Sequence, residues 1–177
     1  LSAPKDKVIV SNATLIVASQ TRASEADRPV FRGCLRSDGR WRDLIVEDSI
    51  SSHGFVVSSL MTAGTWVALN TTVYPDDTAD IYLFDLASGH GDRWFESTGH
   101  VKVLAVAADG RLVYATGITD DSYDPRRDPT STLYAAGPGR PRVTLDEGPG
   151  NAFTDVSITG DIASWKNAGV AKSAALP

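Results

Sequence analysis

The sequence is poor in cysteine, and its basic residues are fewer than its acidic ones. It contains one cysteine, Cys34, which excludes an intrachain disulfide. Its 17 basic residues are outnumbered by 22 acidic ones, and the net charge of −5 argues against nucleic acid as the partner. No apolar run approaches the roughly 18 residues of a membrane-spanning helix, so no membrane insertion is expected. Hydrophobic residues still make up 42% of the chain, enough for a packed core.

Motifs of the common enzyme classes are also missing. The sequence has no Gly-x-Ser-x-Gly nucleophile elbow, no His-Glu-x-x-His zinc motif and no glycine-rich phosphate or dinucleotide loop. A Ser-His-Asp set assembled only by folding stays open, because such triads have no fixed sequence order. The sequence therefore favours a non-catalytic protein that needs no cofactor.

A repeated pattern runs through most of the chain. A tight turn followed by an apolar strand recurs at intervals of about 50 residues, and a second series of strand ends followed by glycine-containing turns has nearly the same period. The first series is marked by Leu15, Trp66, Leu112 and Ile162, and the second by Leu35, Leu86 and Ala136. Two series with one period indicate tandem structural units.

Each unit contains four short runs rich in Val, Ile, Leu, Tyr, Phe and Thr, which predict four antiparallel strands. We therefore predict an all-β fold, a β-propeller of four-stranded blades, with about three and a half to four blades in this chain. The blades span approximately 6–48, 53–97, 100–147 and an incomplete 151–177, so residues 1–177 form one propeller domain or part of one. A flat β-sandwich of the same strands is the alternative.

Two segments resemble the TolB-like propeller family. Val106 to Tyr114 has that family's Asp-Gly turn leading into an apolar strand, and Ala79 to Gly89 is similar to the strand that follows. The resemblance implies an extracellular or periplasmic binding propeller that serves as a scaffold or as a gating domain beside a hydrolase. It carries no catalytic residues over to this chain.

The fourth repeat lacks a last strand, and the residues before Lys7 are too few to supply it. The chain also begins with Leu1 rather than methionine, so we expect a processed form or a piece of something longer. Since an open sheet edge favours association, three interpretations follow. The chain is part of a six- to eight-bladed protein, two copies complete one assembly as a homo-oligomer, or four blades close into a small ring.

The connections differ in length, which predicts the binding face. The long ones run from Thr21 to Pro29, Thr72 to Ala79 and Ile118 to Ser131, and they leave the sheets on one side. This face is acidic, and we predict that it binds a protein or glycan ligand. Candidate binding residues are His53, His100, Asp76, Asp77, Asp80, Asp120, Asp121 and Asp124.

The acidic loops also leave a calcium site open, since Ca²⁺ takes six to eight oxygen ligands. The aspartate spacing does not match an EF-hand loop, so solvated turn aspartates are the simpler interpretation and no metal ligand is predicted. His53 and His100 enter equivalent strands. A pair of imidazoles there could serve a propeller-type hydrolase or lyase, which is the alternative function, as is the propeller part of a longer enzyme. The four tryptophans are expected to pack between blades.

Overall fold

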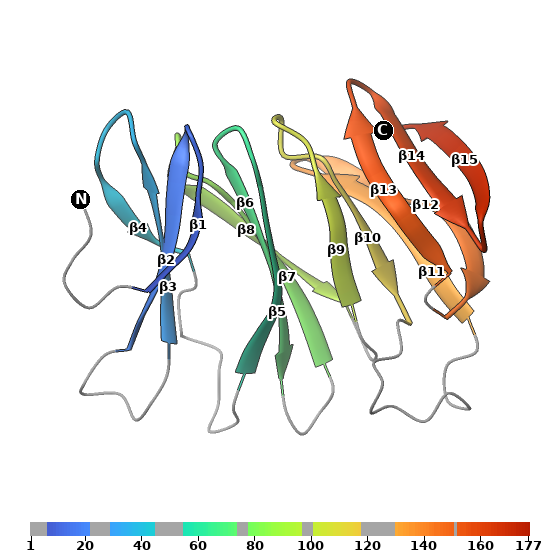
Figure 1. The fold of residues 1–177 in the computed structure, drawn as a ribbon, viewed down its shortest axis with the longest axis horizontal. Coiled ribbons are helices and arrows are strands. Elements are labelled where there is room, and N and C mark those ends of the chain that lie inside the picture. Colours follow the sequence, from blue (N-terminus) through green and yellow to red (C-terminus); the bar gives the residue numbers. More distant parts are fainter. Residues whose placement is uncertain are drawn as a thin grey trace.

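The computed structural model describes residues 7–21, 29–44, 55–73, 78–96, 101–117, 130–150 and 152–177. Within these ranges the chain is entirely β, and its strands form four separate antiparallel sheets. In each sheet the strands follow one another in sequence order, so every sheet is a simple meander. Figure 1 shows the four sheets standing side by side in chain order, from the blue first sheet to the red fourth.

The strand bounds agree closely with the predicted repeat. The first sheet contains β1 (Lys7–Ser11), β2 (Leu15–Thr21), β3 (Pro29–Leu35) and β4 (Trp41–Asp43). The second contains β5 (Phe55–Ala63), β6 (Trp66–Val73), β7 (Thr78–Asp85) and β8 (His90–Glu96). The third contains β9 (Val101–Val106), β10 (Leu112–Thr116), β11 (Thr130–Gly137) and β12 (Arg140–Pro149). The fourth contains only β13 (Phe153–Thr159), β14 (Ile162–Asn167) and β15 (Val170–Ala175).

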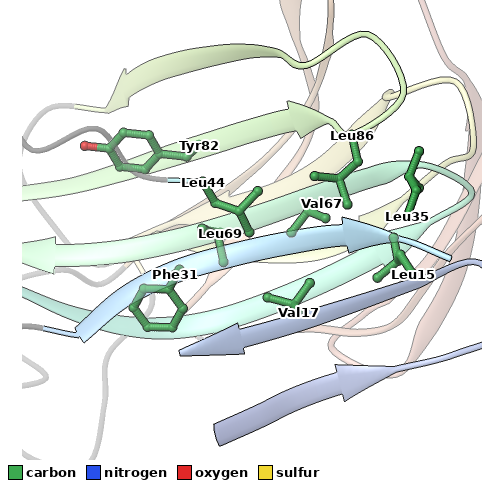
Figure 2. Close-up of a cluster of buried hydrophobic side chains, with 9 residues drawn as sticks. All are labelled: Leu15, Val17, Phe31, Leu35, Leu44, Val67, Leu69, Tyr82 and Leu86. Atoms are coloured by element: carbon green, nitrogen blue, oxygen red, sulfur yellow. The ribbon is translucent and has the colours of Figure 1, made fainter. Parts of the chain in front are cut away.

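Neighbouring sheets pack face to face through apolar side chains, because alternate residues of a strand lie on the same face of its sheet. The first interface joins the first and second sheets (Figure 2). It is formed by Leu15, Val17, Phe31, Leu35 and Leu44 against Val67, Leu69, Tyr82 and Leu86. Gly33 makes this contact close, since a Cβ built there would lie 2.7 Å from the Leu86 side chain. Burial of this apolar surface is the main stabilising term.

Two more interfaces repeat the arrangement. Ile81 and Leu83 of the second sheet meet Leu112 and Tyr114 of the third, and Val113 and Leu133 on the other face of the third sheet meet the fourth sheet. The middle sheets are therefore covered on both faces, which explains their nearly continuous apolar strands. The expected packing of tryptophans between sheets is confirmed for Trp66 and Trp165.

The turns divide the molecule into two ends. The β1–β2, β5–β6 and β13–β14 hairpins, and the β3–β4, β7–β8 and β11–β12 turns, gather at one end, which we call the hairpin end (top of Figure 1). We call the opposite end, where β2, β6 and β10 finish and β3, β7 and β11 begin, the loop end. The expected long connections are found after β2 (22–28) and β10 (118–129), but the predicted one after β6 is only 74–77, no longer than the 86–89 turn at the hairpin end.

One alignment in the predicted repeat was wrong by one residue. Leu112 faces the second sheet, whereas Leu15 and Trp66 face the sheet that follows their own. Arg111 is the true equivalent, since its carbonyl accepts the hydrogen bond from Ala107 that closes the hairpin. The third hairpin has a three-residue loop where the others have two, so aligning on the glycine displaced the register.

The structure supports the all-β and propeller-like parts of the fold prediction, but it shows no closed ring in the part of the chain that it describes. The fourth sheet has three strands there, as the incomplete repeat predicted. Cys34 is a free, buried side chain on β3, and burial raises the pKa of its thiol. Cys34 therefore packs as a small apolar side chain.

Candidate binding surface at the loop end

The hairpin end is held together by polar contacts that pass from sheet to sheet. The Asn12 amide donates to the Thr62 hydroxyl of the second sheet at 3.3 Å. The Arg111 guanidinium donates to the Gly160 carbonyl at 3.1 Å and to Asp161 Oδ1 at 2.7 Å, both in the fourth sheet. Because Arg111 is buried, this contact ties the third and fourth sheets firmly.

The carboxylates of the hairpin end are occupied by local bonds. Asp85 accepts the Thr65 hydroxyl at 2.6 Å and the Ala87 amide at 3.0 Å. Burial opposes ionisation of this carboxyl, but the hydrogen bonds from Thr65, Ala87 and Ser88 outweigh it and lower the pKa. Asp38 likewise binds Arg42 at 3.0 Å. These aspartates shape turns, and their oxygens are committed to the fold.

At the loop end of the second sheet, polar residues enter the interior. Asn70, Thr71 and Asp80 are all at most 3% exposed. Thr71 and Asp80 are register partners on β6 and β7, and they lie on the face toward the first sheet. Asn70 pairs with Ser59 on the opposite face, and the buried Ser59 hydroxyl has no hydrogen-bond partner in the described part of the chain. The hydrophobic core thus gives way to polar side chains as the strands approach this end.

Asp80 is the one predicted binding residue that the structure describes. It is the third residue of β7, close to the strand start, and it is 3% exposed. Asp80 therefore lies at the buried base of the loop end, beside its register partner Thr71. The other predicted residues lie outside the described ranges: His53, His100, Asp76, Asp77, Asp120, Asp121 and Asp124.

Two residues that flank the 118–129 connection are joined by a hydrogen bond. The Ser131 hydroxyl is fully buried and donates to the Gly117 carbonyl at 3.1 Å. Gly117 has a positive φ of 70°, and a Cβ there would lie 2.4 Å from the Thr130 carbonyl oxygen. Only glycine fits such a position, so the backbone conformation at Gly117, where the connection begins, is fixed.

A polar cluster that the sequence did not reveal joins the third and fourth sheets. Asp146 lies within β12, and its Oδ2 accepts hydrogen bonds from Trp165 Nε1 at 2.8 Å and from Asn167 Nδ2 at 2.9 Å. Its Oδ1 accepts from Lys172 Nζ at 2.8 Å and from the Glu147 amide at 3.0 Å. The sequence does not reveal this cluster, because the partners of Asp146 in the fourth sheet lie 19 to 26 residues away along the chain.

The cluster stabilises the ionised form of Asp146. Burial raises the pKa, but the bonds from Lys172, Trp165, Asn167 and the Glu147 amide prevail and bring the pKa of Asp146 to about 2. The carboxylate therefore stays charged at neutral pH. Both carboxylate oxygens of Asp146 accept hydrogen bonds from the fourth sheet, so Asp146 holds the third and fourth sheets together.

The described residues offer no assembled chemical centre. Among them, no three His, Cys, Asp or Glu side chains come together in a way that could hold a metal ion. His90 begins β8 at the hairpin end and is exposed, far along the sheet from the loop end. In the same ranges there is no helix long and apolar enough to cross a membrane.

Comparison with known proteins adds information on the fold. No family model matches the chain, and no curated protein matches it. Solved structures do match, including one from a structural and mechanistic study of two prolyl endopeptidases, with a TM-score of 0.61 and 14% sequence identity. The similarity covers 97% of this chain but only 29% of the prolyl endopeptidase, a protein with a β-propeller domain. At this identity the likeness shows a propeller-like fold alone, and the TolB-like assignment stays a prediction.

Proposed function

We propose that this chain is a non-catalytic β-propeller segment that binds a protein or glycan ligand through its loop end. The surface would be formed by the connections 22–28, 44–54, 74–77, 97–100 and 118–129 on the rigid base of the four sheets. We place the protein outside the cytoplasm, in an extracellular or periplasmic space, in line with the TolB-like resemblance.

The observation that carries this proposal is the difference between the two ends. At the hairpin end, the polar groups of Asn12, Asp85 and Arg111 are used within the fold. At the loop end, the polar residues Thr71, Asp80 and Ser131 are buried at the base of the connections. Long connections such as 22–28 and 118–129, held on a rigid base, are the usual place of ligand contact. The loop end is therefore the better candidate for binding.

Removal of paired charges tests the proposal. Glycan and peptide arrays identify a ligand for the wild-type chain, and titration then compares Asp76→Asn/Asp77→Asn and Asp120→Asn/Asp121→Asn with Asp38→Asn/Asp161→Asn at the hairpin end. We expect at least one loop-end pair to weaken binding about tenfold, roughly 1.4 kcal/mol. Equal loss in the hairpin-end pair, with all variants folded by circular dichroism, would place the ligand elsewhere.

The prolyl endopeptidase likeness favours a second candidate, the propeller part of a longer peptidase. In that case the chain would limit access of a peptide to a catalytic domain and would cleave nothing alone. Incubation with a proline-containing chromogenic peptide checks this, and we expect no cleavage. Cleavage lost in both His53→Ala and His100→Ala would instead establish the hydrolase alternative built on these two histidines.

A further inference from the structure

Three turns at the hairpin end carry a basic residue at the same position of the repeat (Figure 1). Gly39, Gly89 and Gly139 lie 50 residues apart, and all have a positive φ, between 65° and 74°. The residues that follow them are Arg40, His90 and Arg140. The first precedes β4, and the other two are the first residues of β8 and β12. A basic side chain therefore marks the start of the fourth strand in each of the first three sheets.

Packing does not explain these basic residues, because Arg40, His90 and Arg140 are all exposed. Side chains exposed on a surface contribute little to stability. The Arg40 contact with Asp38 uses the Arg40 backbone amide, at 2.8 Å, and leaves the guanidinium outside that bond. Arg140 Nη1 donates to the Pro177 carbonyl, and the guanidinium has further N–H groups. The cations thus recur at positions where the fold does not need them.

Two more arginines extend the pattern along the fourth strands. Arg42 binds Asp38 at 3.0 Å, and a Cβ on Gly89 of the second sheet would lie only 3.5 Å from its Nε. The Arg142 guanidinium lies over the Tyr134 ring, 4.5 Å from the ring centroid. These contacts hold both guanidinium groups beside the turns. We call Arg40, Arg42, His90, Arg140 and Arg142 the basic rim.

The basic rim stands out against the charge of the whole chain. The three equivalent segments 36–42, 86–92 and 136–142 contain five arginines and two aspartates. With His90 neutral, their net charge is +3, in a chain whose net charge is −5. One of the two aspartates, Asp92, lies in the second segment, so the rim is weakest at its middle. The hairpin end therefore presents a local excess of positive charge.

The shape and chemistry of the rim indicate the kind of partner. The largest apolar residue of turns 36–40, 86–90 and 136–140 is Leu86, and it is 1% exposed. A protein partner would need an apolar contact at the centre of its interface, which these turns do not offer. Stacked sheets lie about 10 Å apart, so the cations form a row and not a cluster. A row of cations fits a linear polymer that carries repeated anionic groups.

We propose that the basic rim binds a linear anionic polysaccharide, with carboxylate or sulfate groups along its length. Guanidinium groups bind such anions through paired, charge-assisted hydrogen bonds. The polymer crosses the three turns in the order of the sheets, and its anions contact Arg40, His90 and Arg140. The site lies at the opposite end from the loop end, so the inference does not depend on what the loop end binds.

Titration with polygalacturonate tests the proposal, with neutral dextran as the uncharged reference. We expect polygalacturonate to bind at about 50 mM salt and to bind at least tenfold more weakly at about 500 mM, because salt screens exposed charges. Dextran should not bind. Arg40→Gln/Arg140→Gln should weaken binding about tenfold. The matched control is Lys7→Gln/Lys102→Gln, which removes the same charge from exposed residues at the loop end and should weaken binding by about twofold or less.

A gain of binding separates a direct contact from damage to the fold. Ala87 is exposed in the middle turn, so Ala87→Lys should tighten binding of polygalacturonate by about threefold. Circular dichroism confirms that each variant is folded. Absence of polygalacturonate binding, or an equal loss in the two double variants, would overturn the proposal. Tighter binding of poly-aspartate or of phosphatidylserine vesicles, lost in Arg40→Gln/Arg140→Gln, would also overturn it and would assign the rim to an acidic protein or a membrane.

Discussion

Asp146 of the third sheet and Trp165 of the fourth are joined by a 2.8 Å hydrogen bond, in which the indole Nε1 donates to the carboxylate Oδ2. Trp165 is 3% exposed and the Asp146 side chain 12% exposed, so the bond lies at the edge of the apolar interface between the sheets. The Lys172 ammonium completes the cluster at 2.8 Å from Oδ1. Asp146 therefore links the buried Trp165 ring to the ion pair with Lys172.

Asp146→Asn should destabilise the chain by about 2 kcal/mol, because it removes the charge that Lys172 neutralises and weakens the bonds to Trp165 and Asn167. Urea unfolding followed by tryptophan fluorescence measures the loss. The control is Asp155→Asn, since Asp155 is 67% exposed and has a positive φ of 52° that asparagine tolerates well. An equal loss in both variants would contradict a special role for Asp146.

Acid should weaken the same interface. The pKa of Asp146 is lowered to about 2 in the folded chain from an ordinary value of 3.8, so its contribution is fully present above pH 4. As the pH falls from about 4 toward 2, the unfolded chain takes up a proton before the folded one, and the stability is progressively lost. The difference in unfolding free energy between wild type and Asp146→Asn should shrink over this window. A constant difference would mean that the Asp146 charge plays no part.

The sequence predicted the local elements far better than the contacts between them. Strand periodicity and turn glycines such as Gly64 and Gly160 act within a few residues, and they located the strands of all four sheets. The equivalence of Arg111 to Leu15 and Trp66 was missed because the third hairpin loop has one more residue than the others. An alignment of the repeats on their turn glycines does not detect that residue. The role of Asp146 was missed because its partners are 19 to 26 residues away on other strands. Contacts of this range depend on how sheets stack, which composition and spacing do not encode.

Gly33→Ala should destabilise the first interface by roughly 1–3 kcal/mol, because the new methyl group would overlap the Leu86 side chain at 2.7 Å. The added loss should be smaller when Leu86 is already alanine, since the space is then vacant. A double-mutant cycle of Gly33→Ala and Leu86→Ala, measured by chemical unfolding, gives the coupling directly. Strict additivity of the two changes would argue that these sheets do not pack as described.

Gly110→Ala and Gly160→Ala form a matched pair that isolates the contact of Trp66 with the next hairpin. Both glycines have positive φ, 85° and 57°, so each substitution carries a backbone cost of about 1 kcal/mol. A Cβ at Gly160 meets nothing within 4 Å, whereas one at Gly110 would lie 2.8 Å from the Trp66 ring. Gly110→Ala should therefore be the more destabilising of the two in thermal melts. The excess should fall in a Trp66→Leu background, because the shorter side chain leaves room for the methyl group, and an excess that persists there would assign the cost to the backbone alone.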